Sequence, residues 1–443
     1  MIRRTPTPPP PLRGRLGGGA FGRLMPMIPN SPIRSDRIAA DIDALAAITE
    51  PGRPYTRRAF TPKFLEGRAW LQQEIQHAGF SSHIDAAGNL VATITGTRPE
   101  LGTIMLGSHS DTVPDGGRFD GIAGVVAALE VARALKDQGI TLGHTLEVVD
   151  FLAEEVSIFG VSCVGSRGIS GTRPPDWLAR SSDELTLEAG IAQVGGNPTV
   201  DAKRNDIKAF LELHIEQGPV LQDENLDIGV VTAIAGITRI EIIVTGRADH
   251  AGTTPMASRQ DALTTAAWIA LGVEELGKAL SRNTFHFAAT VGEFVMEPNA
   301  ANVVPAKVRM LVDARAEHRP DMDRFVEELG RGIAAIADKT GVAVSEPRIV
   351  SDNQPTPCND DLLDVLDIAC DTVGATHRHM ASGAGHDTAW MARITRAAMI
   401  FIPCRDGRSH SPDEFTTTEA IALGAAVLFE AVIALDKNLQ EDQ

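Results

Sequence analysis

The chain has 443 residues, of which 43% are hydrophobic and 22% are charged, and its formal net charge at pH 7 is −17. This composition is typical of a soluble globular protein, and the length predicts two or three domains. The negative charge argues against nucleic acid and anionic membranes as partners, because both require a basic surface, and no apolar run approaches the roughly 18 residues of a membrane span.

The beginning of the chain differs from the rest. Residues 1–35 contain four consecutive prolines, three consecutive glycines and several arginines. Such a segment cannot bury enough apolar surface to become ordered, and it lacks the continuous apolar stretch of a signal peptide. We therefore expect a disordered tail here.

An α/β region is predicted for residues 36–233. Ser35 and Asp36 are the expected N-cap of a first helix over Ile38–Ile48, and a second helix over Leu65–Ala78 ends before a glycine. Further along, apolar runs predict strands and one intervening helix, at Leu90–Ile94, Gly102–Leu106, Gly121–Gln138 (the helix), Thr145–Phe151 and Ala209–Leu213. This alternation predicts an α/β sheet covered by helices on both faces.

A smaller α+β region interrupts this pattern at residues 234–347. Alternating polarity over Arg239–Thr245 predicts a half-exposed strand. A helix, two strands and a second helix are expected to follow, at Asp261–Leu276, Phe285–Val291, Lys307–Ala314 and Pro320–Lys339. Residues 348–443 then add a buried strand, Ala397–Ile402, and a last helix, Thr417–Leu435. We therefore expect a discontinuous larger domain, residues 36–233 and 348–443, interrupted by a smaller one.

Five polar clusters follow predicted strands, and open α/β sheets bind ligands at the carboxyl ends of their strands. The clusters are GSHSD (107–111), GGRFDG (116–121), AEE (153–155), LHIEQG (213–218) and DGRSHSP (406–412). In the first, Asp111 can accept the second N–H of His109, which would fix the tautomer of the imidazole. In the second, Asp120 taken alone is best interpreted as a simple helix N-cap.

Adjacent carboxylates and separate histidines complete the pattern. Glu154 and Glu155 follow a buried strand, where they repel each other and lose solvation, and a cation would relieve both costs. The alternative interpretation is two solvated acids at the start of a loop. A lone histidine at His214 or His410 would more often be a core or surface residue. Together, however, three histidines and two or three carboxylates at strand ends match a divalent-metal site, in which a shared aspartate can bridge two ions.

At this point the sequence resembles a known family. Eight segments in order are similar to the hydantoinase/carbamoylase family of metal-dependent amidases: GSHSDTVPDGGRFDG, AEE, ELHIEQGP, DHAGTTPM, EPNAANVVP, DAR, SGAGHD and RDGRSHSPDE. Members of that family include N-carbamoyl-L-amino-acid hydrolases, allantoate amidohydrolases and β-ureidopropionases. The resemblance runs from about Asp36 to the C-terminus, so only the N-terminal segment lies outside it.

The resemblance implies a role for individual positions. It implies that His109, Asp120 and His214 bind one metal ion, and that Asp120 bridges to a second ion bound by Glu155 and His410. Glu154 would be the general base and Asp111 the residue that orients His109. The remaining positions would contact the substrate: Gln217, His250, Asn302, Arg315 and Gly383, with Asn302 and Arg315 holding a carboxylate and His250 also acting in catalysis from the partner subunit.

The family also implies a fold and an activity. The expected fold is an aminopeptidase-like α/β catalytic domain with an inserted α+β lid, and residues 234–347 would form a homodimer. Two divalent ions per subunit, zinc or manganese with cobalt or nickel as alternatives, would activate a water together with Glu154. The water would attack the carbamoyl or ureido carbonyl of a small carboxylate-bearing substrate. Ile237 and Thr238 replace residues that are frequently polar in the family, and this departure leaves the particular substrate open.

Other interpretations remain at this stage. An aminoacylase or metallopeptidase would use the same metals and base on another bond. A non-catalytic binding protein is disfavoured because the base and all five ligands are present. No G-x-S-x-G segment occurs among these clusters, which disfavours a serine hydrolase, and His386 serves equally well as a residue that orients its loop. Four widely spaced cysteines, Cys163, Cys358, Cys370 and Cys404, are expected to be reduced, which favours a cytoplasmic location.

Overall fold

In the computed structural model of the protein, residues 31–283 and 286–441 are described. The tail predicted for residues 1–35 therefore lies almost entirely outside the described residues. Helix α1 spans Ser35–Ala47 and its N-cap is Arg34, which makes no side-chain capping bond. The predicted Ser35–Asp36 cap is therefore wrong. The chain is held there instead by Glu130, whose carboxylate accepts the backbone N–H of Arg34 at 2.8 Å.

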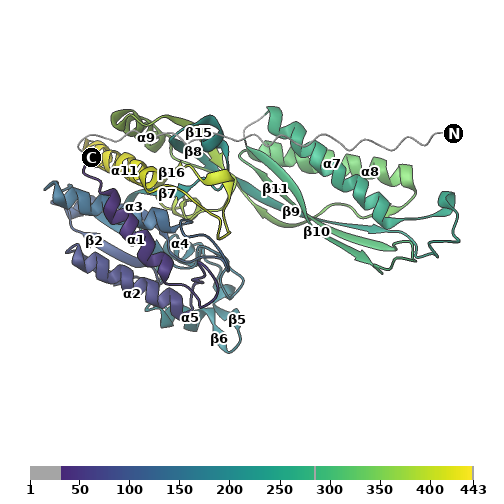
Figure 1. Cartoon of the computed structure of the whole chain (residues 1–443), viewed down its shortest axis with the longest axis horizontal. Helices are drawn as coiled ribbons and strands as arrows, with labels where there is room; N and C mark the ends of the chain where they lie inside the picture. Colours follow the sequence, from purple (N-terminus) through teal and green to yellow (C-terminus); the bar gives the residue numbers. More distant parts are fainter. Residues whose placement is uncertain (1–30, 284–285, 442–443) are drawn as a thin grey trace, which may run out of the picture.

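A mixed sheet forms the centre of the larger part of the described chain (Figure 1). Its strand order is β1-β2-β4-β3-β7-β16-β8-β14, with β15 paired to β8. The four central strands are parallel to one another: β4 (Thr145–Phe151), β3 (Thr103–His109), β7 (Ile207–Ile215) and β16 (Arg396–Ile402). The flanking strands are β1 (Ser81–Ile84), β2 (Leu90–Ile94), β8 (Ile228–Ile234), β14 (Thr356–Pro357) and β15 (His377–Ser382). The parallel centre means that several strands end at the same edge.

Helices cover both faces of this sheet, as the sequence predicts. Successive residues of one strand face opposite sides, so Leu106 joins one hydrophobic cluster and Met105 the other. The helices on the Leu106 side are α1, α3 (Ile122–Asp137), α9 (Asp360–Val373) and α11 (Thr418–Glu441). The other face packs against α4 (Val164–Ile169) and α10 (Thr388–Met391), and α2 (Pro62–His77) lies beside β1 and β2.

Helix α11 is long and apolar enough to cross a membrane by length and composition alone. In the fold, however, 67% of its most apolar window is buried. It packs against α9, α3 and α1 in the largest hydrophobic cluster. Its apolar character is therefore that of a core helix.

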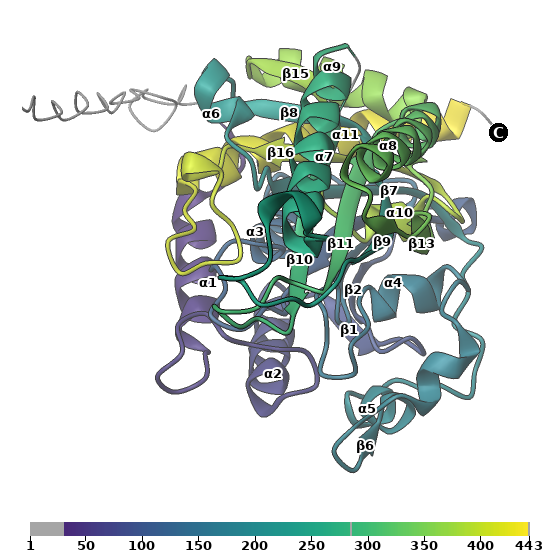
Figure 2. The ribbon, with the colours of Figure 1, turned by 90° about the vertical axis from the view of Figure 1, so that its right-hand side faces the viewer.

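A second sheet extends away from the first (Figure 1), and in the perpendicular view of Figure 2 its strands and helices lie in front of the main sheet. Its strands are β9 (Gly236–Thr245), β10 (Phe287–Glu297), β11 (Lys307–Ala316), β12 (Ala343–Val344) and β13 (Arg348–Asn353). Helices α7 (Ala262–Asn283) and α8 (Arg319–Thr340) cover one face of it through a separate hydrophobic cluster. Because β13 pairs with β9, this unit runs to Asn353, six residues beyond the boundary predicted at residue 347.

Short elements complete the described chain. They are α5 (Leu187–Gln193), α6 (Val220–Glu224), the hairpin of β5 (Ser181–Ser182) and β6 (Leu185–Thr186), and the 3-10 turns at Pro99–Leu101, Pro175–Ala179, Met256–Ser258 and Arg405–Gly407. The last of these turns lies directly before the second-metal cluster predicted around His410.

Candidate metal centre and active site

The parallel strands bring the predicted ligands to one edge of the main sheet. His109 is the last residue of β3, and His214 is the penultimate residue of β7. Glu154 and Glu155 follow the end of β4, and His410 follows β16. Four separate segments therefore supply polar side chains at the carboxyl ends of neighbouring strands, which is where ligands bind in sheets of this type.

Asp120 lies at the centre of these side chains. Its Oδ1 is 3.6 Å from His109 Nε2 and 3.2 Å from His214 Nε2. Its Oδ2 is 3.4 Å from His410 Nε2, which in turn is 3.1 Å from Glu155 Oε1. The two oxygens thus serve two groups of potential ligands, and within each group the ligand atoms lie within 4.8 Å of one another. Asp120 is not the helix cap that it resembles on its own, since Gly121 occupies the N-cap of α3 without a side-chain bond.

Backbone carbonyls fix the orientation of the two buried histidines. Nδ1 of His214 lies 2.9 Å from the carbonyl oxygen of Ile215, so it donates there and Nε2 keeps its lone pair. Nδ1 of His109 lies 3.1 Å from the carbonyl oxygen of Asp111 and 3.5 Å from its carboxylate. The main-chain oxygen of Asp111 therefore provides the nearer anchor, although the sequence pointed to its side chain. His109 Nε2 is buried without a hydrogen-bond partner in the described residues, as expected for a nitrogen that would bind a metal ion.

The electrostatics of the site also fit a cation. Burial opposes ionisation of Asp120, but the neighbouring His214 holds the pKa of its carboxyl well below the ordinary value. Hydrogen bonds to Asp120 and Glu155 raise the pKa of His410 to about 11. Burial raises the pKa of Glu154 well above its ordinary value. Without a metal ion the cluster therefore holds extra protons, and a divalent ion would take their place.

Glu154 lies where a general base would be needed. Its Oε2 is 3.6 Å from His109 Nε2, and its backbone N–H donates to Asp111 Oδ1 at 3.2 Å. The preceding residue, Ala153, has a φ of 54°, so a left-handed turn separates Glu154 from the buried strand. On its other side Glu154 Oε1 is 3.7 Å from the thiol of Cys163. The side chain is thus held beside both the histidine and Asp111.

A supporting network around Asp120 was missed in the sequence. Glu414 is buried, and its Oε1 accepts the backbone N–H groups of Phe119 and Asp120 at 2.8 and 3.0 Å. Ser409 donates toward Asp120 Oδ2 at 2.6 Å, and the predicted pocket residue Gln217 donates to the same oxygen at 2.6 Å. Burial raises the pKa of Glu414 to about 7. The available signal was its position as the last residue of the RDGRSHSPDE segment.

The predicted substrate contacts fall into two separate places. Arg315, near the end of β11, donates from Nη1 to the carbonyl of Gly383 at 2.7 Å and from Nε to Asp313 at 2.8 Å. It therefore lies next to the larger part of the chain. His250 and Asn302 lie together, since a bridge pairs His250 with the neighbouring Val303 and the Asn302 carbonyl accepts from Ala251 at 2.9 Å.

These two places are at opposite ends of the small sheet. Asn302 precedes the start of β11, whereas Arg315 is near its end, eight residue steps along the extended strand from Lys307. At about 3.3 Å per residue this separation is roughly 26 Å. His250 and Asn302 are also exposed to solvent. A single chain therefore does not bring Asn302 and Arg315 around one substrate.

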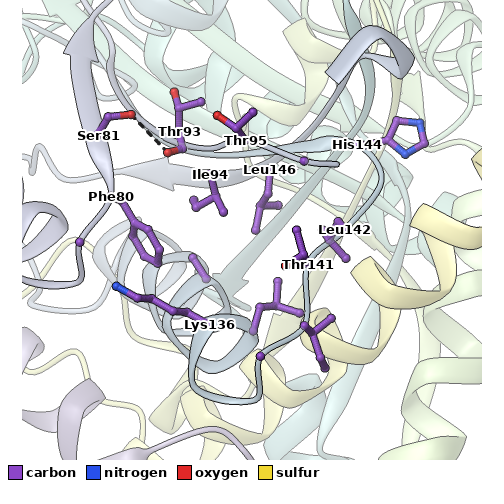
Figure 3. A pocket seen from close by; sticks show the side chains of 16 residues that line it. Phe80, Ser81, Thr93, Ile94, Thr95, Lys136, Thr141, Leu142, His144 and Leu146 are labelled. Carbon is purple, nitrogen blue, oxygen red and sulfur yellow. Dashed lines mark hydrogen bonds between the residues drawn. The ribbon is translucent and has the colours of Figure 1, made fainter. Parts of the chain in front are cut away.

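A pocket of about 440 Å³ lies elsewhere, between the β1–β2 hairpin and the end of α3 (Figure 3). Phe80, Ile94, Lys136 and Leu146 are among its lining residues, and Ser81 donates to the carbonyl of Thr93 at its rim at 3.4 Å. None of the predicted site residues lines it. Its size alone does not make it the reactive site, because it lacks a cluster of convergent ionisable groups.

Comparison with known proteins identifies the family. The model of peptidase family M20/M25/M40 matches residues 105–434. The chain belongs to this family. Within it, the chain is a hydantoinase/carbamoylase-type amidase: it superimposes on such an amidase from Burkholderia multivorans with a TM-score of 0.86 and 34% identity, covering 91% of this chain and 98% of that one.

The names of curated relatives of this M20 protein describe hydrolases of ureido compounds. An N-carbamoyl-L-amino-acid amidohydrolase from Paenarthrobacter aurescens is 35% identical, over 91% of this chain and 98% of that protein. A ureidoglycolate hydrolase from Oryza sativa subsp. japonica is 34% identical, over 95% of this chain and 87% of that protein. An aminopeptidase PepT from Bacillus cereus, at 19% identity and a TM-score of 0.62 over 92% of this chain and 100% of that one, shares the fold. The predicted aminopeptidase-like fold is thus confirmed, and the chain is a metal-dependent hydrolase of this family.

Proposed function

We propose that the protein hydrolyses the carbamoyl or ureido C–N bond of a small carboxylate-bearing substrate, such as an N-carbamoyl-L-amino acid or an allantoate-like compound, with two divalent metal ions. The observation that carries the proposal is the pair of ligand groups that share Asp120, with Glu154 next to His109. The names of the relatives support the carbamoyl bond rather than the peptide or N-acyl bond of an aminoacylase or metallopeptidase.

The residues present fit two divalent ions. His109, Asp120 and His214 would hold one, and Asp120, Glu155 and His410 the other. Mixed imidazole and carboxylate donors suit zinc or manganese, with cobalt or nickel as alternatives. When bound, such ions supply a Lewis acid for the substrate carbonyl and lower the pKa of a coordinated water. Removal of the ions should therefore abolish turnover.

Glu154 has the position and environment of the general base. It is buried, which raises the pKa of its carboxyl and makes the carboxylate a stronger proton acceptor. In the proposed reaction Glu154 takes a proton from the attacking water and delivers it to the departing nitrogen. Hydrolysis of an N-carbamoyl amino acid by one water then gives ammonia, carbon dioxide and the free amine.

Arg315 would bind the substrate carboxylate. A planar guanidinium matches a carboxylate in two-point geometry. Asp313 and the carbonyl of Gly383 each accept one N–H of Arg315, at 2.8 and 2.7 Å, and thereby hold the group in place. A substrate bound in this way would lie between the small sheet and the metal centre.

A homodimer through residues 234–347 would place His250 and Asn302 at a second active site. Both are exposed at the end of the small sheet that lies farthest from Arg315, so they are available to a partner subunit. Backbone N–H groups of Gly252 and Thr253 donate to His250 Nδ1 at 3.0 and 3.2 Å, which leaves Nε2 as an N–H donor. A donor of this kind could stabilise negative charge on the substrate carbonyl oxygen.

Complementation tests the dimer directly. His250→Ala and Glu154→Ala chains should each be inactive alone, whereas verified heterodimers contain one site with both residues intact. Because one of the two sites is intact, we expect these heterodimers to recover up to about half of the wild-type rate per dimer. No recovery, with each chain inactive alone, would show that His250 acts within its own chain.

The cysteines support a cytoplasmic location. All four are free and buried, as expected for a protein that does not rely on disulfides.

A substrate panel tests the proposed activity. Ammonia release is measured from N-carbamoyl-L-amino acids, allantoate and β-ureidopropionate, and free amine from N-acetyl amino acids and dipeptides. Turnover of ureido compounds that disappears in Glu154→Ala, with metal content unchanged, supports the proposal. Turnover of acetyl compounds or dipeptides alone would refute it in favour of an aminoacylase or peptidase.

A further inference from the structure

A second pocket, of about 160 Å³, lies where the chain passes between the two sheets. We call it the hinge pocket, and its defining residues are Arg167, Ile237, Asn353, Gly385, Trp390 and Arg393. Both connections line it, since Ala235 separates β8 from β9 and Gln354 lies between β13 and β14. Helices α4 and α10 supply the arginine–tryptophan side of the pocket.

The hinge pocket borders the metal centre. Two of its lining residues, Cys163 and His386, also contact site residues. The Cys163 thiol is 3.7 Å from Glu154 Oε1, and the ring of His386 is 4.6 Å from that of His214 between centroids. One layer of side chains therefore separates the pocket from the proposed base and from a proposed metal ligand.

The pocket also borders the proposed carboxylate-binding arginine. Ile237 lies directly opposite Arg315 in the pairing of β9 with β11. Gly385 is two residues after Gly383, whose carbonyl accepts from Arg315 at 2.7 Å. A substrate with its carboxylate on Arg315 and its ureido group beside Glu154 would therefore direct its remaining substituent toward the hinge pocket.

The charge of the lining indicates the chemistry of that substituent. Two arginines line the pocket and, among the described residues, no aspartate or glutamate does, in a chain with a net charge of −17. The guanidinium of Arg167 lies between two indole rings, 3.4 Å from the centroid of Trp390 and 4.7 Å from that of Trp177. Its Nε is buried without a hydrogen-bond partner in the described residues. Burial and the neighbouring Arg393 lower the pKa of Arg167. A bound anion would accept the free Nε–H of Arg167 and would offset the repulsion between the two guanidinium groups.

We propose that the hinge pocket binds a second carboxylate of the substrate, carried on the substituent next to the carboxylate that Arg315 binds. This proposal rests on the proposed function and narrows its substrate to ureido derivatives of dicarboxylic acids, such as N-carbamoyl-L-glutamate or N-carbamoyl-L-aspartate. A short carboxylate side chain fits a pocket of about 160 Å³. Ile237 and Trp390 would contact its methylene groups, and Arg167 and Arg393 would bind its charge.

The experiment compares three substrates of the metal-loaded enzyme. N-carbamoyl-L-glutamate and N-carbamoyl-L-glutamine have the same shape and differ in charge, and N-carbamoyl-L-leucine is apolar. We expect kcat/KM for the glutamate derivative to exceed that for the glutamine derivative by about tenfold or more, because charge-assisted hydrogen bonds are roughly twice as strong as neutral ones. Equal values, or a preference for leucine, would overturn the proposal.

Variants show whether the hinge pocket causes the preference. Arg393→Gln changes an exposed residue and should reduce the glutamate-to-glutamine ratio by about tenfold, mainly through KM. Arg167→Lys keeps charge between the indoles but loses the two-point geometry, and should reduce the ratio by a smaller factor. The matched control is Arg331→Gln on α8, with a side chain 67% exposed, which should leave the ratio unchanged. An unchanged ratio in Arg393→Gln and Arg167→Lys would overturn the assignment of the pocket.

A free anion is the other source of the same chemistry. Inorganic phosphate is added to the glutamine derivative, and its effect is compared in the wild type and Arg393→Gln. If phosphate changes kcat in the wild type only and the glutamate preference is absent, the pocket serves a separate anion and the substrate proposal fails. Absence of ammonia from all three substrates would overturn the hinge-pocket proposal, whereas absence of ammonia from the whole ureido panel, allantoate and β-ureidopropionate included, would refute the proposed function itself.

Discussion

Gly121→Ala should remove metal binding while the fold is retained. A Cβ at Gly121 would lie 2.4 Å from Cε1 and Nε2 of His109, the nitrogen proposed to bind a metal ion. Gly121 also has a φ of 67° and a ψ of −46°, a conformation outside the left-handed helical region, so a side chain there costs at least about 1–2 kcal/mol in backbone strain. The imidazole has to move, because real Cβ contacts are never this short.

The magnitude follows from what is displaced. One of the three donors of the first ligand group is lost, so the affinity of that group should fall by more than about 100-fold, since even indirect perturbations of ligands cost 10–100-fold. The matched control is Gly139→Ala near the other end of α3. Gly139 has a φ of 65°, and no atom lies within 4 Å of the position that the added methyl group would take, so this variant has the strain of a positive φ without the clash.

Calorimetric titration of metal-stripped protein with zinc gives the affinity, and urea denaturation gives the free energy of unfolding. Without metal, Gly139→Ala should lose about 1–2 kcal/mol of stability and Gly121→Ala should lose more, and only Gly121→Ala should lose metal affinity. Equal zinc affinity in the two variants would refute the assignment of His109 Nε2 as a ligand.

Three further predictions follow from the contacts described. Asp436→Ala leaves the buried backbone N–H groups of Gly143 and His144 unpaired and should lower the free energy of unfolding, measured by urea denaturation, by about 2–4 kcal/mol. The pKa of Asp436 is lowered in the folded protein, so its stabilising contribution is present above the unfolded pKa and should be lost as the pH falls. His410 has a pKa of about 11 and is therefore protonated at pH 7 without metal, so metal binding should release its proton and should become tighter as the pH rises. Calorimetry in buffers of different ionisation enthalpy measures the released protons, and no proton release would contradict the role of His410 as a ligand. Arg315→Ala should raise KM about 10–100-fold with metal content unchanged. The matched control Arg309→Ala, on the same face of β11, should leave KM unchanged, and equal effects of the two variants would show that Arg315 does not bind the substrate.

The sequence predicted most of the regular structure, because burial dominates it. The apolar runs at Leu90–Ile94 and Thr145–Phe151 are strands with those bounds. The strands β8 and β15 were not predicted: β8 runs directly toward β9 with only Ala235 between them, and β15 carries polar residues at the edge of the sheet. Pattern alone does not separate such segments from loops.

The site was predicted unevenly for a different reason. His109, Glu154 and His214 follow from strand ends, because parallel strands place their carboxyl ends together. The supporting hydrogen bonds around Asp120 could not be deduced from spacing, since they depend on one segment almost 300 residues downstream, which contains Ser409 and Glu414. The separation of Asn302 from Arg315 depends on the direction and length of β11, which residue types do not encode.

The most direct test of the central claim is metal reconstitution followed by ammonia release in one sample. Metal-stripped protein is titrated with zinc or manganese, bound ions per chain are counted by mass spectrometry, and hydrolysis of an N-carbamoyl-L-amino acid is followed at each step. The account predicts no ammonia without metal and full activity as occupancy reaches two ions per chain. Ammonia release from metal-free protein, or two bound ions with no hydrolysis of any ureido compound, would contradict it.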